Sequence, residues 1–380
     1  MNALVVATVV LVVVAAAPYV LFLGLYAVMR PSGSPVEKEA CEPSVSVVLP
    51  TYNEERIVEG KLEGICGWNY PMEKVEVVVV DSSDDGTRDI VRKFFEGRET
   101  PSLVLIEEDE RGGVASAVNE AVAAASGEVV FRTDCDSELA SEAVREAVST
   151  LAHDDVTAVT GRQATVLGAS EVEADYRDIL SRLQAVETRL DSTFIAHGPC
   201  FAFYREAFRP LAADTVADDT EIAVGIRRRD GRVIMDPTMR FAESGVSGFS
   251  RRRSRKDRRA LGLVQSLWRN RDMLGGYGWY GRAVLPFNWW FMIVSPWLLV
   301  LIGVLGTTAV LVWLWWIGLA LPAIFLLGLW LGQRDSLGPI QPIHAVVDAQ
   351  VSLLAGGVML ALGGASGTWE IDRDSREVFE

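Results

Sequence analysis

The chain has 380 residues, of which 49% are apolar and 23% are charged, and its formal net charge is −15 at pH 7. This length allows two or three structural units, and the apolar share is high for a soluble protein. The composition therefore argues against a wholly soluble chain and makes the placement of the apolar residues the first question.

The first predicted element is an apolar segment close to the start of the chain. Residues 3–29 contain no charged side chain, and this length is enough to cross a bilayer. A signal peptide is the competing interpretation, but no basic region precedes the segment, and Arg30-Pro31 is a poor cleavage site. We expect residues 1–30 to form a retained transmembrane helix, followed by a polar linker over residues 31–43.

Residues 44–245 alternate apolar runs with helical patterns, which indicates an α/β domain with a mainly parallel sheet. Strands are predicted over 44–50 and 75–80, and each is followed by polar residues that open a helix. Ligands of open α/β sheets bind beyond the carboxyl ends of the strands, so these turns predict a nucleotide site. Taken singly, Asn53 and Asp85 are better explained as turn and helix-cap residues, but not when they occur in series with Asp134 and Asp136.

A pair of aspartates follows the run 128–131, which is apolar after Glu128. Asp134 and Asp136, separated by Cys135, stand where a strand is predicted to end in a turn. Two carboxylates at this spacing can hold a divalent cation against a diphosphate. Because aspartates are common in surface turns, the pair gains weight only from the motifs around it.

A basic stretch precedes the second apolar region. Residues 251–282 hold ten basic side chains against two aspartates, a local charge of about +8 that leaves about −23 for the remainder of the chain. Together with Trp268 and Trp279, this stretch predicts membrane-interface helices over residues 246–282 that contact lipid headgroups. A nucleic-acid patch is the weaker alternative, and we expect no nucleic-acid partner.

Three further transmembrane helices are predicted over residues 283–369. Residues 283–333 carry no charge, and we expect them to divide near 303–308 into two spans. A third span is expected from about 350 to 367, and an acidic tail, 370–380, follows it.

Basic residues flank the ends of the predicted spans. By the positive-inside rule, Arg30, Lys38, Arg334 and the stretch 251–282 place residues 44–245 in the cytoplasm. The sequence thus predicts a multi-pass protein of the cell membrane whose α/β domain is cytoplasmic and whose termini face outward.

Neither the excess of acidic residues outside 251–282 nor the cysteines predict a further functional site. The excess of carboxylates resembles the surface of a salt-adapted, halophilic protein, although codon bias explains the preference for arginine over lysine equally well. The four cysteines lack metal or disulfide spacing, so we expect reduced, packed thiols at Cys41, Cys66, Cys135 and Cys200.

Six motifs follow one another between about residues 44 and 265, which is more than half of the chain. They lie at residues 50–54, 81–87, 111–113 with Ala117 and Asn119, 133–136, 198–203 and 217–221. This ordered set resembles the family 2 inverting glycosyltransferases. The resemblance implies an α/β catalytic domain of the GT-A fold, Rossmann-like with a mainly parallel sheet, attached to transmembrane α-helices.

The resemblance also implies a site for a nucleotide sugar. Thr51 and Glu54 would lie near the base, Asp81 would contact the uracil or the ribose, and Asp85 would fix the following turn. The implied nucleotide-sugar-binding residues are Thr51, Asn53, Glu54, Asp81, Asp85, Arg111, Gly112, Asn119, Asp134 and Arg258.

Metal and catalytic roles follow from the same resemblance. Asp134 and Asp136 would meet the ribose and a Mn²⁺ or Mg²⁺ ion, with Asp136 the first choice for direct ligation. Asp219 would be the general base, and Asp218 would orient it or raise its pKa. Alternatively, these two aspartates cap a helix over 220–227. The implied acceptor-side residues are Gly198, Pro199, Cys200 and Phe201.

Two positions depart from the family's pattern. Residues 255–265 resemble a segment with a Gln-x-x-Arg-Trp motif, but Arg255 and Arg259 replace its glutamine and tryptophan, so Arg258 alone remains to meet the diphosphate. Val114 stands where many relatives carry lysine. The missing tryptophan puts processive polymer synthesis in doubt.

The sequence as a whole predicts a membrane-bound inverting glycosyltransferase. We expect it to move a sugar from a nucleotide sugar, with a UDP-sugar favoured, to a lipid carrier or lipid-linked saccharide during glycan assembly. Its partners would be the donor, a lipid-linked or saccharide acceptor, and membrane lipids. The alternatives are a processive polysaccharide synthase of the hyaluronan or cellulose type and a non-catalytic membrane scaffold with the same fold.

Overall fold

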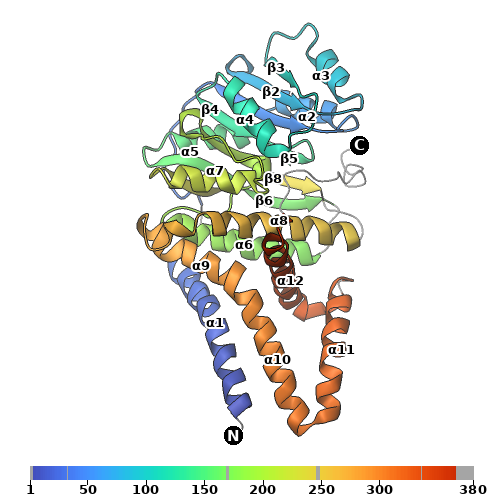
Figure 1. Ribbon diagram of the computed structural model, residues 1–380. Coiled ribbons are helices and arrows are strands. Elements are labelled where there is room, and N and C mark those ends of the chain that lie inside the picture. Colours follow the sequence, from blue (N-terminus) through green and yellow to red (C-terminus); the bar gives the residue numbers. More distant parts are fainter. Residues whose placement is uncertain (1–2, 32, 168–170, 245–248, 335, 365–380) are drawn as a thin grey trace.

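The computed structural model describes residues 3–31, 33–167, 171–244, 249–334 and 336–364. An α/β layer lies at one end of the molecule, two long helices cross beneath it, and apolar helices extend away on the opposite side (Figure 1). The predicted acidic tail lies outside the described residues.

Eight strands form one mixed sheet. They are β1 Val45–Thr51, β2 Val75–Asp81, β3 Ser102–Glu107, β4 Val129–Arg132, β5 Ser137–Leu139, β6 Val156–Leu167, β7 Phe201–Tyr204 and β8 Arg232–Ser244. Their order in the sheet is β3-β2-β1-β4-β7-β6-β8-β5, with β1 to β4 parallel and β7 antiparallel to both of its neighbours. The expected α/β fold, Rossmann-like with helices on the sheet, is confirmed.

Helices cover both faces of this sheet. They are α2 Val58–Cys66, α3 Thr87–Phe95, α4 Val114–Ala124, α5 Ala143–Leu151 and α7 Asp218–Arg227. β1 and β2 are valine-rich and buried almost throughout, because apolar side chains of α2, α3 and α5 cover one face and those of α4 and α7 cover the other. The parallel strands therefore end in turns that are fixed from both sides.

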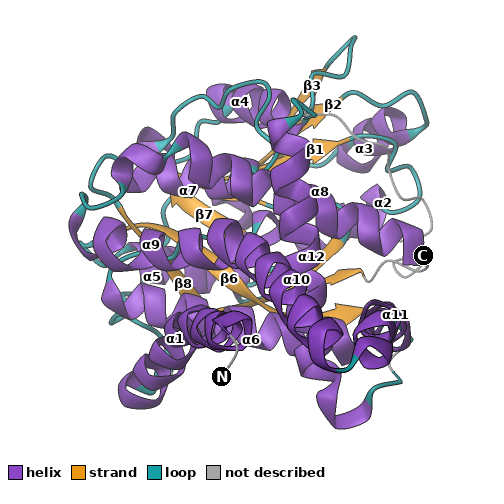
Figure 2. Ribbon diagram, turned by 60° about the horizontal axis from the view of Figure 1, so that its bottom comes forward, coloured by secondary structure: helices purple, strands orange, loops and turns teal. Residues whose placement is uncertain are grey.

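Two long helices, α6 (Glu171–Leu190) and α8 (Phe249–Arg269), lie between the sheet and the apolar helices (Figures 1 and 2). A third apolar cluster joins these layers, and it includes Phe194, Leu267 and Tyr280. Short 3₁₀ turns connect other elements at Met72–Lys74, Gly198–Cys200, Arg205–Ala207, Arg271–Met273 and Gly338–Ile340.

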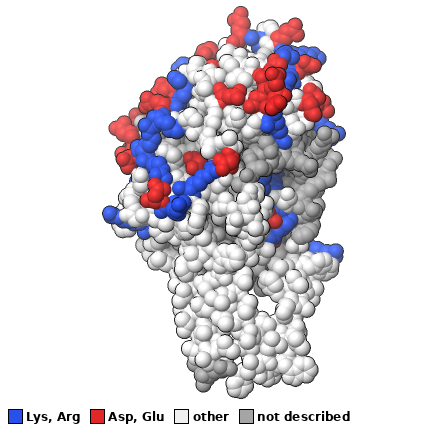
Figure 3. Space-filling model, viewed as in Figure 1, with Lys and Arg blue, Asp and Glu red and all other residues white. Residues whose placement is uncertain are grey.

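Four helical segments within the described residues are long and apolar enough to cross a membrane. They are α1 (Ala3–Met29), the segment Tyr280–Trp313, α11 (Trp315–Gly332) and Ile343–Ala361 of α12 (Gln341–Ala361). The second comprises π-helical Tyr280–Val284, α9 Leu285–Trp289, π-helical Trp290–Val294 and α10 Ser295–Trp313. Charged side chains gather over the α/β layer, and most of the surface below it is uncharged (Figure 3).

Two predicted boundaries in this region are wrong. The expected division near 303–308 does not occur, because an apolar helix tolerates its glycines, and α10 continues to the non-helical Leu314. The last helix begins at Gln341 rather than near 350. The acidic Asp348 fits inside it because Arg253 and Lys256 of α8 each form an ion pair with it at 2.8 Å.

Candidate active site

One cavity of about 350 Å³ lies between the carboxyl ends of the parallel strands and the helices beneath them. The turns after β1, β2 and β3 line one end, and the turn after β4 and the start of α7 line the middle. The other end is lined by α8 and by Ala345, Ala349, Ser352 and Leu353 of α12. The cavity thus joins the α/β layer to a helix long and apolar enough to cross a membrane.

Many of the predicted site residues line this cavity together. They are Thr51, Glu54, Arg111, Asp134, Asp136, Gly198, Pro199, Asp218, Asp219 and Arg258. These residues come from six separate places in the chain, and the fold brings them around one space because parallel strands end on the same edge of a sheet.

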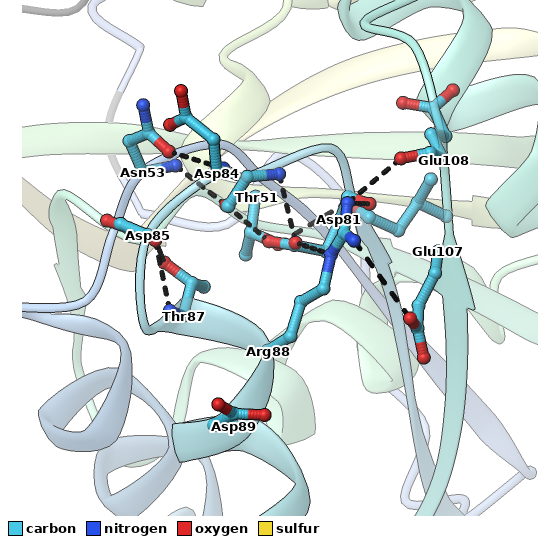
Figure 4. Close-up of polar contacts among 12 residues, drawn as sticks. Thr51, Asn53, Asp81, Asp84, Asp85, Thr87, Arg88, Asp89, Glu107 and Glu108 are labelled. Carbon is cyan, nitrogen blue, oxygen red and sulfur yellow. Dashed lines mark hydrogen bonds and ion pairs between the residues drawn. The ribbon is translucent and has the colours of Figure 1, made fainter.

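Asp81 lies behind the cavity wall rather than in it. Its side chain is fully buried, and its two oxygens accept hydrogen bonds from Thr51 Oγ1 at 2.6 Å, the Ser83 hydroxyl at 2.6 Å and the Ser83 amide at 3.0 Å. Arg88 Nε donates to it at 2.7 Å (Figure 4). These contacts tie the turns after β1 and β2 together.

Asn53 and Asp85 make local contacts within the same two turns. Asn53 Oδ1 accepts the amide of Asp84 at 3.0 Å, and Asn53 has a positive φ of 55° (Figure 4). Asp85 Oδ1 accepts the amide of Thr87 at 3.0 Å, where α3 begins. Both geometries match the alternative of turn residues, although the N-cap of α3 is Gly86 rather than Asp85.

The remaining predicted residues shape the site from outside it. Asn119 exchanges two hydrogen bonds with the backbone of Leu211, at 2.8 and 3.0 Å. Cys200, a free thiol, and Phe201 are buried in the sheet's core clusters. Gly112 is exposed, and a Cβ there would meet the Ser116 side chain at 2.9 Å.

A buried lysine that the sequence analysis did not identify supports the turn carrying Asp134 and Asp136. Lys61 Nζ donates to Thr133 Oγ1 at 2.8 Å, to the Ser137 carbonyl at 2.7 Å and to its hydroxyl at 3.0 Å. Burial lowers the pKa of Lys61 to about 8, against the opposing influence of nearby acidic groups. Its signal in the sequence is a lysine on the apolar face of a helix, between Val58 and Leu62.

Arg132, also absent from the prediction, joins the two pairs of aspartates. Its guanidinium forms ion pairs with Asp134 at 3.2 Å and with Asp218 at 2.9 Å. Burial opposes the charge of this group, but the surrounding aspartates outweigh it and raise the pKa of Arg132. A Cβ at Gly198 would lie 1.7 Å from Arg132 Nη1, so a larger residue there would displace the Arg132 guanidinium.

Asp219 is held at the first turn of α7, which begins at Asp218 rather than at Thr220. Its Oδ2 accepts the amide of Gly198 at 2.8 Å, and its Oδ1 accepts the amide of Thr220 at 2.6 Å. Burial and the negative charge of Asp218 raise the pKa of Asp219 to about 6, although Arg132 opposes them. A carboxylate with this pKa can accept a proton near neutral pH.

Asp134 and Asp136 fit a cation that is shared with a phosphate ligand. Burial raises the pKa of Asp134, and Asp136, Asp218 and Glu243 add to this effect while Arg132 opposes it. A divalent ion would relieve that crowding of negative charge. No cluster of three or more metal-ligating side chains occurs among the described residues. Mg²⁺-type sites often use one or two carboxylates and complete their shell with substrate phosphates, and this pair suits that arrangement.

Cations of α8 face the same part of the cavity. Burial lowers the pKa of Arg258 to about 10, and repulsion by Arg259 and Arg255 adds to the effect. Arg255 lies 3.6 Å from Asp136, and Arg259 lies 2.9 Å from Glu243. This arrangement of arginines suits a diphosphate next to the aspartate pair.

The α/β layer and the charged cavity at its strand ends fit a glycosyltransferase with a GT-A fold, and comparison with known proteins shows this class. The model of "Glycosyl transferase family 2" matches residues 46–211, and that of "Glycosyl transferase family group 2" matches residues 129–331. The chain contains a glycosyl transferase family 2 domain, and it belongs to glycosyl transferase family group 2, whose model covers more than half of it.

Individual relatives match different shares of the chain. A solved mannosyltransferase from Pyrobaculum calidifontis, in complex with GDP-Man and Mn²⁺, has a TM-score of 0.78 and 28% identity, covering 95% of this chain and 99% of its own. Glycosyltransferase AglE of Haloferax volcanii is 31% identical over 147 residues, 38% of this chain and 48% of AglE. Probable glycosyltransferase YdaM of Bacillus subtilis is 31% identical over 148 residues, 38% of this chain and 34% of YdaM. The match thus spans less than half the length of these two curated relatives.

Proposed function

We propose that this protein is a membrane-bound inverting glycosyltransferase that moves a sugar from a nucleotide sugar to a lipid-linked acceptor during glycan assembly. One observation carries the proposal, namely that the cavity lined by the predicted donor residues at one end is lined by α8 and α12 at the other. A donor from water and an acceptor from a bilayer would meet in such a space.

The donor would bind along the strand ends, with its diphosphate between the aspartate pair and α8. Asp134 and Asp136 would hold a Mn²⁺ or Mg²⁺ ion, which neutralises charge on the leaving diphosphate when bound. Arg258 would contact the same phosphates from α8. The Mn²⁺ in the Pyrobaculum calidifontis mannosyltransferase supports a divalent ion here.

Asp219 would act as the general base. It would take the proton of the attacking acceptor oxygen, which is a sugar hydroxyl of a lipid-linked saccharide or the P–OH of a lipid phosphate, while that oxygen forms a bond to the anomeric carbon of the donor sugar. The bond from the anomeric carbon to the phosphate oxygen breaks on the opposite face, its electron pair leaves with the nucleoside diphosphate, and the configuration inverts. Asp218, paired with Arg132, would keep the base in position.

The acceptor would enter from the side of α12. Leu263 of α8 and Ala349 and Leu353 of α12 give that end an apolar wall, while Arg252 of α8 supplies charge for an acceptor phosphate. The four apolar segments support a multi-pass membrane protein. The basic residues at the ends of these segments support a cytoplasmic α/β layer.

The test is release of nucleoside diphosphate by the purified protein in detergent. A panel of UDP- and GDP-sugars would be supplied with Mn²⁺, with and without a polyprenyl phosphate, and Asp219→Asn would serve as the inactive control. We expect release that requires both metal and lipid, with one sugar added per acceptor. A growing sugar ladder without lipid would favour a processive synthase, and equally slow release by wild type and Asp219→Asn would favour a scaffold.

A further inference from the structure

A stacked pair of side chains forms part of the cavity wall at the strand ends. The guanidinium of Arg111, in the turn before α4, lies 3.9 Å from the ring centroid of Tyr52, in the turn after β1. Both side chains line the cavity. A planar group stacked in this way offers a face on which an aromatic base can lie.

A carboxylate stands beside that wall. Glu108 follows β3, its amide donates to the Asp81 carbonyl at 2.9 Å, and its side chain lines the cavity together with Ser82. Burial raises the pKa of Glu108, and the negative charges of Glu120 and Asp81 add to this, while a hydrogen bond from Ser82 opposes it. Hydrogen-bond donors from a ligand would therefore stabilise the ionised carboxylate of Glu108.

Two neighbouring carboxylates are engaged elsewhere. The oxygens of Asp81 accept four hydrogen bonds from Thr51, Ser83 and Arg88, and Asp81 does not line the cavity. Glu107 forms an ion pair with Arg92, and its side chain leaves β3 on the other side from that of Glu108 (Figure 4). Glu108 is therefore better placed than either of them to contact the edge of a stacked base.

We propose that Glu108 reads the nucleotide base and selects guanine. Guanine carries two adjacent donors, N1–H and the N2 amino group, which match the two oxygens of one carboxylate. Uracil presents a single N3–H between two carbonyl oxygens, and these repel the second carboxylate oxygen. The inference rests on the proposed function, since it assumes a nucleotide donor, and it replaces the expectation of a uridine nucleotide contacted by Asp81.

Binding of three nucleoside diphosphates to the full chain in detergent tests this assignment. GDP, IDP and UDP would be titrated by calorimetry in the presence of Mn²⁺, because inosine differs from guanosine only in lacking the N2 amino group. We expect GDP to bind about tenfold or more tightly than IDP and UDP. UDP binding as tightly as GDP, or IDP matching GDP, would overturn the proposal while leaving a nucleotide-dependent transferase intact.

Matched variants then identify the residue. Glu108→Gln should weaken GDP binding about tenfold, to the level of IDP, while the adjacent Glu107→Gln should leave the GDP to IDP ratio unchanged. If Glu54→Gln abolishes the preference for GDP over IDP and Glu108→Gln does not, Glu54 contacts the guanine base and the proposal is overturned. Failure of wild type to bind any of the three would contradict the proposed function itself.

Discussion

At the scale of single residues, Lys61 shows how a buried charge can serve a site it does not touch. Its three hydrogen bonds end on Thr133 and Ser137, which flank Asp134 and Asp136 on either side. The turn that carries the two carboxylates is therefore fixed from beneath.

Replacing Lys61 with methionine should lower the affinity for the metal ion, beyond any effect on the melting temperature. The change removes the bonds that orient the turn, and lost support of this kind lowers metal affinity about 10- to 100-fold. Mn²⁺ affinity would be measured in the presence of nucleoside diphosphate, alongside the melting temperature. The exposed Lys74→Met is the control, and unchanged Mn²⁺ affinity with a lowered melting temperature would leave Lys61 a purely structural role.

The pH dependence of the reaction should report on Asp219. Its pKa of about 6 lies above the usual value for an aspartate, and only the deprotonated form can accept a proton. The rate at saturating donor should therefore be lost as pH falls through about 6. Arg132→Met removes a positive charge that opposes the shift, so it should move this limb of the pH–rate profile to higher pH, whereas an unmoved limb would mean that another group titrates.

That Asp134, Asp136 and Asp219 lie around one cavity could be predicted from the sequence, because each of them belongs to a short motif. Arg132 and Lys61 could not, since each becomes informative only through partners that the fold supplies. Arg132 stands in a strand and pairs with Asp218, 86 residues later in the chain. No local pattern records such a pair.

At the scale of elements, α12 shows why boundaries are harder to predict than the existence of a helix. Asp348 interrupts the apolar pattern, and its neutralisation by Arg253 and Lys256 of α8 cannot be seen in the sequence near it. Gly356 allows the two helices to lie close together, since a Cβ there would meet the backbone nitrogen of Leu261 at 2.7 Å.

A bulky side chain on the cavity face of α12 should block the acceptor but not the donor. Ala349 lines the end away from the strands, so Ala349→Trp should lower transfer to a polyprenyl phosphate about tenfold or more, by occluding the acceptor, while GDP or UDP affinity stays unchanged. Transfer rate and nucleotide binding would be measured on the same preparation. Val358→Trp, on an exposed part of the same helix, is the control. Equal transfer by both variants would contradict an acceptor path along α12.

At the scale of the whole molecule, Glu187 of α6 links α6, which lies beneath the sheet, to α9, which belongs to one of the apolar helical segments. Its carboxylate is buried and accepts hydrogen bonds from Asn288 at 2.6 Å, Phe194 at 3.0 Å and Thr193 at 3.1 Å. Burial raises the pKa of Glu187 to about 7, although these three bonds oppose the shift. The junction is thus most stable when Glu187 is protonated.

The stability of the protein should therefore fall as pH rises. A carboxyl group whose folded pKa exceeds its unfolded value stabilises the fold below the unfolded pKa, and this contribution is lost as pH rises through about 7. The loss is on the order of 3 kcal/mol. Melting temperatures in detergent from pH 5 to pH 8 would measure it, and Glu187→Gln should flatten the curve. An equally steep curve in the variant would assign the pH dependence to other groups.

The order of the motifs predicted the family and the α/β layer, because local patterns record strands, turns and apolar spans. The packing of that layer on α8 and α12, which completes the cavity, follows from contacts between distant segments and could not be predicted.

The shared wall of the cavity has a consequence for how the reaction is confined. An α/β layer separated from its helices would keep the aspartates but lose the side of the cavity that α8 and α12 form, so its active site would be incomplete. Under the proposed function, transfer to a lipid-linked acceptor would occur only at the membrane surface. Its rate would depend on the area density and lateral diffusion of the acceptor in the bilayer, and not on a bulk concentration.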